Sequence, residues 1–262
     1  MRAVILAAGK GTRLRPYTEG LPKGMLEFAG KPLIEHQIGT LRRNGISDIV
    51  IVTGYAREKI TFDVRYAHNP DYDTTNMVET LFCARDELEG DVLVCYADIL
   101  YDDSVLNVVL ESDADIGVVV DDDYWDYWTA RCDDPASDIE SMIIRDGRIV
   151  DLGRGDCSLE EAQQRYVGLI KFSASGIEVL KDTYDAHKNH VGPWLGSPSF
   201  KKAYMTSMLQ AIIDSGFDVK PITISRGWLE FDTVEDYERA NRWAEENSLS
   251  RFYSCNTADL RY

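Results

Sequence analysis

The sequence has few cysteines, and none of them shows the spacing of a metal-binding or redox pair. Five occur in 262 residues, at positions 83, 95, 132, 157 and 255, and no two form a Cys-x-x-Cys pair. The odd number and the missing pattern argue against a disulfide framework or a cysteine-based zinc site. We therefore expect reduced cysteines in a reducing compartment, the cytoplasm.

Long hydrophobic runs are also missing. The longest early run is AVILAA at residues 3–8, whereas a membrane-spanning helix needs about 20 apolar residues. It is equally too short for the core of a signal peptide, so we expect no membrane partner. Because it has no repeats or low-complexity segments, we expect one α/β domain over residues 1–247, with a ligand-binding part at about 99–230, and an irregular tail at 248–262.

Positive charge is scarce, and it is unevenly distributed. The chain carries 28 Lys and Arg against 45 Asp and Glu, a net charge of −17, which argues against a nucleic-acid polymer as partner. Residues 1–31 nevertheless hold six basic and two acidic residues. A small basic island in an acidic protein indicates a small polyanion as its ligand.

Apolar runs that alternate with amphipathic segments set the expected fold. Continuous apolar runs predict buried strands, helical periodicity predicts the helices between them, and Asp146-Gly147 predicts the turn of a hairpin. Alternating strands and helices imply a mostly parallel sheet covered on both faces. The expected strands are 2–7, 48–54, 91–98, 115–121, 166–173 and 218–225, the hairpin is 141–153, and the helices are 31–45, 74–88, 175–188, 199–215 and 231–247.

A glycine loop with several cations follows the first strand, in VILAAGKGTRLRPYTEGLPK at residues 4–23. It lacks the spacing of a P-loop, and Leu14 stands where a dinucleotide fingerprint needs its third glycine. Gly9 and Gly11 alone could mark only a tight turn, and single cations could be solvated charges. Together with Arg13 and Lys23 they favour a loop that holds a phosphorylated ligand.

The segment LAAGKGTRLRPYTEGLPKGMLEFAGKPLIEHQI, residues 6–38, resembles the N-terminal signature of the nucleotidyltransferases that make nucleotide-activated sugars and alcohols. GISDIVIVTGY at 45–55 extends the similarity. The resemblance implies a Rossmann-like, GT-A type fold, with a mixed, mostly parallel central sheet flanked by helices. It also implies that the first strand and its loop hold the base and triphosphate of a nucleotide.

The resemblance assigns roles by position. Lys23 would lie at the reacting phosphates, and Arg13 would hold phosphate beside it. Asp98 ends the third strand and Asp232 precedes the last helix, and the family places Mg²⁺ between two such positions. The implied nucleotide-binding residues are Leu6, Ala7, Ala8, Gly9, Lys10, Gly11, Thr12, Gly54, Thr75, Asn76 and Ala97.

Structural alternatives stand beside some of these roles. Asp98 could cap a strand end, and Asn76 could cap a helix. Asp232 competes with Thr233 as the cap of the last helix, where Thr233 and Asp236 have capping-box spacing.

The acceptor side departs from the sugar-1-phosphate enzymes. Ala97 stands where those enzymes usually have glycine, and the Glu-Lys-Pro stretch is missing. NPDYDTTNMVETL at 69–81 looks instead like the corresponding segment of the phosphocholine cytidylyltransferase branch, which implies CTP, with Thr75 and Asn76 near the cytosine. The implied reaction is attack of an acceptor phosphate or phosphonate on the α-phosphorus, with pyrophosphate leaving.

An acidic, aromatic stretch at 121–134, DDDYWDYWTARCDD, is the first candidate for the acceptor site. Its aromatic rings and carboxylates suit an ammonium group, and Arg131 suits a phosphate or carboxylate, so we expect Trp128 and Arg131 to contact the acceptor. The alternatives are a solvated loop anchored by its aromatic side chains, and an acceptor site near Tyr166 and Lys171.

Other functions stay open at this level. A GT-A glycosyltransferase would use an Asp-x-Asp metal motif, which Asp98-Ile99-Leu100 lacks and which 121–123 satisfies only formally. A sugar-1-phosphate enzyme using UTP, dTTP or GTP remains an alternative. A non-catalytic nucleotide-sensing relative would be expected to lose Lys23 or Asp98, and this chain keeps both. The sequence leaves a homodimer open.

Overall fold

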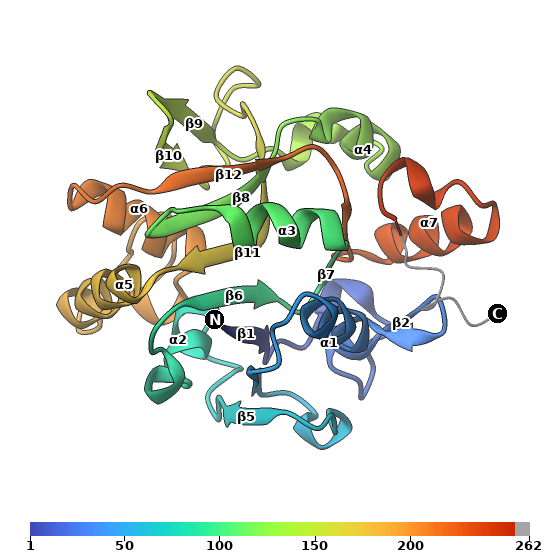
Figure 1. The fold of residues 1–262 in the computed structure, drawn as a ribbon, viewed down its shortest axis with the longest axis horizontal. Helices are drawn as coiled ribbons and strands as arrows, with labels where there is room; N and C mark the ends of the chain where they lie inside the picture. The colour runs from blue at the N-terminus through green and yellow to red at the C-terminus, as the bar shows by residue number, and fades with distance from the viewer. Residues whose placement is uncertain (255–262) are drawn as a thin grey trace.

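The computed structural model describes residues 1–254, and among them seven strands form one central sheet (Figure 1). The order across the sheet is β12-β8-β11-β6-β1-β4-β5. Every neighbouring pair is parallel except those made by β11, which runs against both β6 and β8. The expected mixed, mostly parallel sheet is therefore confirmed. The strands are β1 Arg2–Ala7, β4 Ile49–Thr53, β5 Arg65–His68, β6 Val92–Tyr96, β8 Ile116–Asp121, β11 Arg165–Phe172 and β12 Lys220–Ile224.

Two apolar cores lie on the two faces of this sheet. Side chains alternate along β1, so that Ala3 and Ile5 join one core, while Val4 and Leu6 join the other. The first core is covered by α1 (Leu33–Arg43) and α3 (Asp103–Glu111), which lie in front of the strands in Figure 1. The second is covered by α2 Met77–Phe82, α5 Ala174–His187 and α6 Met205–Asp214.

Short strand pairs outside the main sheet position the site. β7 (Ile99–Tyr101) pairs antiparallel with β13 (Trp228–Glu230), and Phe231 N–H donates to the carbonyl of Asp98 at 2.9 Å. This pairing brings Asp98 and Asp232, far apart in sequence, to one point. The other pairs are β2 Glu27–Phe28 with β3 Lys31–Pro32, and the expected hairpin of β9 Met142–Arg145 with β10 Arg148–Leu152.

Several helices differ from the expected ranges. The helix expected at 74–88 is α2, which starts after its cap Asn76, and a separate 3₁₀ turn at Arg85–Glu87. The one expected at 199–215 is a 3₁₀ turn at Phe200–Lys202 followed by α6. The last helix is α7 (Val234–Glu245), and its capping box of Thr233 and Asp236 is confirmed.

Part of the expected irregular tail is ordered against the core. Leu249–Arg251 form a 3₁₀ turn, and Phe252 and Tyr253 are buried. The Phe252 ring packs beside Tyr127 of α4 (Tyr124–Arg131) and Trp243 of α7, so the predicted tail begins with a short turn held against these helices. Residues 255–262 lie outside the described part of the chain.

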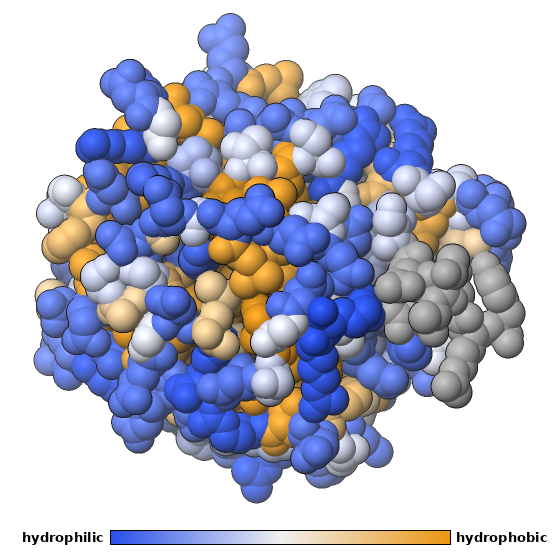
Figure 2. Space-filling model, in the orientation of Figure 1, coloured by the Kyte–Doolittle hydropathy of each residue, from blue (hydrophilic) through white to orange (hydrophobic). Residues whose placement is uncertain are grey.

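The surface is largely polar. Figure 2 shows a mostly hydrophilic face, interrupted near the middle by a narrow apolar strip. No helix within residues 1–254 has the length and apolar character needed to cross a membrane.

Candidate active site

A cavity opens at the carboxyl ends of β1 and β6, the sheet edge where open α/β folds bind ligands. The loop after β1 and the start of α2 complete its wall. Nine residues assigned by resemblance to the nucleotide or the metal meet here: Leu6, Ala7, Ala8, Gly9, Lys23, Thr75, Asn76, Ala97 and Asp98. The fold therefore gathers most of the predicted nucleotide site, and binding by these residues stays a prediction.

Lys23 lies between the two predicted metal carboxylates. Its Nζ is 2.6 Å from Asp98 Oδ2 and 2.7 Å from Asp232 Oδ1. Arg13 Nη2 reaches the other oxygen of Asp232 at 2.6 Å, while most of the Arg13 side chain remains exposed. Two cations and two carboxylates are thus concentrated at one end of the cavity, which is the charge arrangement that phosphoryl transfer needs.

The ion pairs keep this cluster charged despite its burial. Burial by itself would lower the pKa of Lys23, but attraction by Asp98 and Asp232 outweighs it, and the pKa is raised. Burial would raise the pKa of Asp232, but Lys23 and Arg13 hold it below its usual value. Lys23 is therefore an ammonium and Asp232 a carboxylate at neutral pH.

One oxygen of this cluster has no partner. Asp98 Oδ1 is buried and makes no hydrogen bond with any described residue. An unsatisfied buried carboxylate oxygen is costly unless a ligand supplies its partner. Carboxylate oxygens suit Mg²⁺, so Asp98 with Asp232 fits the metal site that the resemblance implies.

Glycine lets the loop approach Lys23. Gly11 has φ +60°, and a Cβ added there would lie 2.9 Å from Lys23 Cβ. The turn is held by Thr18, whose hydroxyl donates to the Gly11 carbonyl at 2.7 Å. A larger residue at this position would strain the backbone and displace the lysine.

The remaining predicted nucleotide residues lie around the cavity rather than in its wall. Lys10 pairs with the Asp73 carboxylate, and Thr12 begins the 3₁₀ turn Thr12–Leu14. Gly54 packs behind the loop, where an added Cβ would come within 2.7 Å of the Ala8 carbonyl. Asn76 does cap α2, accepting from Met77 N–H at 2.9 Å, and it also lines the cavity.

A second cavity adjoins the first and shares Asp98 with it. Arg13, Asp232 and Tyr166 are among the residues that line it. Tyr166 is placed here because β11 runs antiparallel to β6, so the beginning of β11 lies at the active-site edge. Its hydroxyl donates to that of Tyr96 at 3.0 Å. Tyr166 therefore lines the second cavity, and its contact with an acceptor stays a prediction.

Lys171 does not line the second cavity, because β11 runs antiparallel to β6 and carries it away from the active-site edge. It is further along β11 and pairs with Leu93, near the beginning of β6, so it lies toward the opposite edge of the sheet. Its ammonium donates to the Ser112 carbonyl, and the residue is buried. The expectation that Lys171 helps to bind the acceptor is contradicted by this placement.

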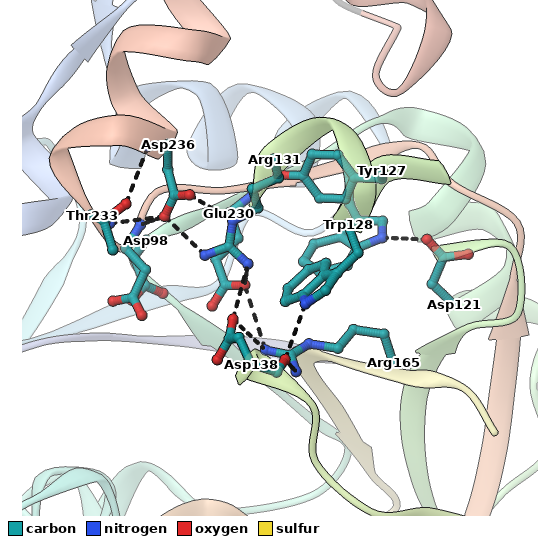
Figure 3. Close-up of polar contacts among 12 residues, drawn as sticks. Asp98, Asp121, Tyr127, Trp128, Arg131, Asp138, Arg165, Glu230, Thr233 and Asp236 are labelled. Atoms are coloured by element: carbon teal, nitrogen blue, oxygen red, sulfur yellow. Dashed lines mark hydrogen bonds and ion pairs between the residues drawn. The ribbon is translucent and has the colours of Figure 1, made fainter. Parts of the chain in front are cut away.

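The expected acceptor loop at 121–134 is largely a helix, α4, with a buried face (Figure 3). Trp128 has no exposed surface, and its ring lies between the guanidinium groups of Arg131 and Arg165, 4.3 and 3.9 Å from its centroid. Arg131 donates two hydrogen bonds of 2.8 Å to Asp236 and one of 2.8 Å to Glu230. Trp128 and Arg131 are therefore committed to packing and ion pairing, which corrects the expected acceptor contact.

The formal Asp-x-Asp motif at 121–123 is also structural. Asp121 is buried, and its carboxylate accepts from the indole N–H of Trp228 at 2.7 Å and from the backbone N–H of Arg226 at 3.0 Å. Its oxygens are satisfied, and it lines neither cavity. This placement argues against a glycosyltransferase metal site at 121–123.

Sequence reasoning missed part of the site. Tyr72 and Tyr96 line the first cavity, and Glu140, Arg165 and Glu230 line the second. The position of Tyr96 at the site could have been predicted from the sequence, because it stands two residues before Asp98 at the end of a strand. The other acceptor-side residues come from distant segments that only the tertiary structure brings together.

Comparisons with known proteins agree with this geometry. The model of the MobA-like NTP transferase domain matches residues 3–164. CTP:phosphoglutamine cytidylyltransferase of Campylobacter jejuni is 33% identical over 250 residues, covering 91% of this chain and 98% of that protein. CMP-5′-(3-aminopropyl)phosphonate synthase of Streptomyces rubellomurinus is 34% identical over 115 residues, covering 40% of this chain and 18% of that protein.

A solved structure shares the fold over nearly the whole chain. The CTP:phosphocholine cytidylyltransferase of Streptococcus pneumoniae superimposes with a TM-score of 0.70 at 26% identity, covering 93% of this chain and 98% of that structure. The resemblance seen in the glycine loop thus extends to the fold as a whole.

Proposed function

The chain belongs to the family of MobA-like NTP transferase domains and is a nucleotidyltransferase, and from this premise we propose that it transfers the cytidylyl group of CTP to a small acceptor. The acceptor oxygen that attacks belongs to a phosphate or phosphonate group. It forms a bond to the α-phosphorus of CTP while the bond from that phosphorus to the bridging oxygen breaks, and pyrophosphate leaves.

The nucleotide would lie in the first cavity. The backbone of Leu6 to Gly9 and the side chains of Thr75 and Asn76 would surround its nucleoside, with the triphosphate directed toward Lys23. Lys23 and Arg13 would neutralise the charge that accumulates as pyrophosphate leaves. The acceptor is already an anion, so the reaction requires no general base.

Asp98 and Asp232 would hold Mg²⁺, and Asp98 Oδ1, which makes no hydrogen bond within the described part of the chain, would supply one ligand oxygen. When bound, the ion would neutralise phosphate charge and orient the phosphates. No group of three or more His, Cys, Asp or Glu in residues 1–254 could hold a metal, so nucleotide oxygens and water would complete the coordination. Lys23 would then exchange its carboxylate contacts for phosphate contacts.

The acceptor would lie in the second cavity, which meets the first at Asp98. We propose a small acceptor with an ammonium group at one end and the phosphorus group at the other, of the phosphocholine, aminoalkylphosphonate or phospho-amino-acid type. The names of the relatives from Campylobacter jejuni and Streptomyces rubellomurinus include acceptors of this kind. A sugar-1-phosphate enzyme is the alternative.

The observation that carries this proposal is the Lys23–Asp98–Asp232 cluster where the two cavities meet. Pyrophosphate release should be measured with CTP, UTP, dTTP, GTP and ATP, each against phosphoglutamine, phosphocholine, 2-aminoethylphosphonate and glucose-1-phosphate. We expect turnover with CTP and an amine-bearing acceptor, and its loss when Mg²⁺ is chelated. Comparable turnover with UTP or dTTP and the sugar phosphate would favour the alternative.

A further inference from the structure

We infer that Glu140 binds the ammonium group of the acceptor and so determines which acceptors the enzyme selects, an inference that rests on the proposed function. Glu140 lies between Ile139 and β9 and lines the second cavity, the same cavity that contains Asp98 and Asp232. A small molecule in this cavity can therefore face Glu140 and the Asp98–Asp232 centre at the same time.

The first argument is the charge pairing within the cavity. Every other charged side chain in its wall has an opposite charge within 4 Å. Asp98 and Asp232 pair with Lys23, and Arg13 pairs with Asp232. The remaining pairs are Glu230 with Arg131 at 2.8 Å, and Asp138 with Arg131 and Arg165 at 3.8 Å each.

Glu140 alone in this wall has no such partner. Within residues 1–254 its carboxylate makes no hydrogen bond or ion pair, although the residue is half-buried. A half-buried carboxylate without a cation is poorly compensated. A cationic group on the ligand would supply the missing charge.

The second argument is the arrangement of tyrosines. The hydroxyls of Tyr96 and Tyr166 are hydrogen-bonded, with their rings edge to face at a centroid distance of 5.8 Å. Burial raises the pKa of the Tyr166 hydroxyl, and the negative charges of Glu140 and Asp98 raise it further. Glu140, Asp98 and Tyr166 all line this one cavity, so a ligand there can face all three.

Gly168 makes this tyrosine pair possible. It has φ +86°, and an added Cβ would lie 2.7 Å from the Tyr96 ring. The register of β11 against β8 shifts between Tyr166 and Ile170, around this glycine. The strand is irregular where it presents Tyr166 to the cavity, as bulges beside active sites often are.

Hydrogen-bonding chemistry narrows the kind of ammonium group. A primary ammonium has three N–H donors, which the Glu140 carboxylate and the Tyr166 oxygen can accept. A trimethylammonium group has no donor and depends on contact with aromatic faces. The cavity thus favours a primary amine, as in 2-aminoethylphosphonate, over the quaternary amine of phosphocholine.

The test measures binding without requiring turnover. The protein is saturated with α,β-methylene-CTP and Mg²⁺, and acceptors are titrated by calorimetry. Two matched pairs of acceptors isolate the contribution of the ammonium charge, because one member of each pair lacks it. The pairs are 2-aminoethylphosphonate with ethylphosphonate, and phosphoglutamine with its Nα-acetyl derivative. Variants are Glu140→Gln, Glu140→Asp, and the control Glu160→Gln, which removes an exposed carboxylate outside both cavities.

We expect Glu140→Gln to weaken binding of the amine-bearing acceptors about 10- to 100-fold, the usual range for a lost charged hydrogen bond. Binding of the amine-free partners and of the nucleotide should not change. Glu140→Asp should retain part of the affinity, and Glu160→Gln all of it. Phosphocholine should bind more weakly than 2-aminoethylphosphonate.

Equal affinity of the wild type for both members of each pair would overturn the inference. So would an equal loss for both members in Glu140→Gln. The proposed function fails separately: it is contradicted if the wild type binds an acceptor and CTP but releases no pyrophosphate.

Discussion

Lys23 and Arg131 each join carboxylates from separate segments of the chain, and only Lys23 lies at the candidate active site. Lys23 contacts Asp98 and Asp232 beside two cavities, and Asp98 Oδ1 has no hydrogen-bond partner among residues 1–254. Arg131 contacts Glu230 and Asp236 with a side chain that is only 3% exposed.

The two clusters differ in whether all of their buried carboxylate oxygens have hydrogen-bond partners among the described residues. The Asp236 oxygens accept from Arg131 and from the backbone N–H groups of Asp232 and Thr233. The cluster around Arg131 therefore joins α4 to the segment that carries Asp232 (Figure 3). A saturated cation–carboxylate set holds the fold together, whereas an unsaturated one beside a cavity is available for a ligand. The predictions below test this division.

The largest effect is expected at the two metal carboxylates. Asp98→Asn and Asp232→Asn keep the side-chain shape but remove a negative oxygen ligand. Each should lower kcat by about 10³-fold or more, because the Mg²⁺ site loses half of its protein charge. Single-turnover assays across a Mg²⁺ titration measure this, with circular dichroism to confirm folding. Unchanged Mg²⁺ dependence in Asp232→Asn would remove that residue from the site.

Arg131→Met should lower the free energy of unfolding rather than weaken acceptor binding. Removing one partner of a buried ion pair typically costs about 3–5 kcal/mol of unfolding free energy. Urea unfolding measures the loss, and Arg131→Lys, which keeps the charge but not the forked geometry, should lie between Met and wild type. A stable Arg131→Met protein with only a raised acceptor KM would restore Arg131 to the acceptor site.

Lys23→Ala should lower turnover by about 10²-fold, since an electrostatic contact to the reacting phosphates is lost. The same variant should bind Mg²⁺ without nucleotide more tightly than the wild type, because the lysine no longer pairs with both carboxylates. Rapid-quench kinetics and metal titration give the two values. A wild-type rate in Lys23→Ala would exclude this lysine from the chemistry.

The smallest effect is expected at Lys171. Because it lies toward the far edge of the sheet, Lys171→Met should leave kcat and both KM values within about twofold of wild type. Steady-state kinetics at saturating CTP provide the check. A selective rise of the acceptor KM would contradict its placement.

The grouping of the predicted nucleotide residues around one cavity could be foreseen because most of them belong to one segment. Leu6 to Gly9 and Lys23 lie in one continuous segment, and Asp98 follows a strand whose apolar run is plain. The order of the elements then determines which sheet edge they share.

The acceptor side was less predictable. The spacing of Tyr124, Tyr127, Trp128 and Arg131 is that of one helix face, and reading it would have indicated burial of α4. The antiparallel direction of β11, which separates Tyr166 from Lys171, depends on strand pairing across the sheet. The place of Glu140 in the cavity likewise depends on tertiary structure.

The most direct test of the account is Mn²⁺ binding to the complex with α,β-methylene-CTP, followed by electron paramagnetic resonance. Wild type, Asp98→Asn and Asp138→Asn should be compared, because Asp138 lines the same second cavity as Asp98 but does not contact Lys23. We predict that Asp98→Asn weakens Mn²⁺ binding by about tenfold or more, as expected for the loss of a charged ligand, while Asp138→Asn binds like the wild type. Equal affinity in Asp98→Asn and wild type would contradict the assignment of this cluster as the reacting centre.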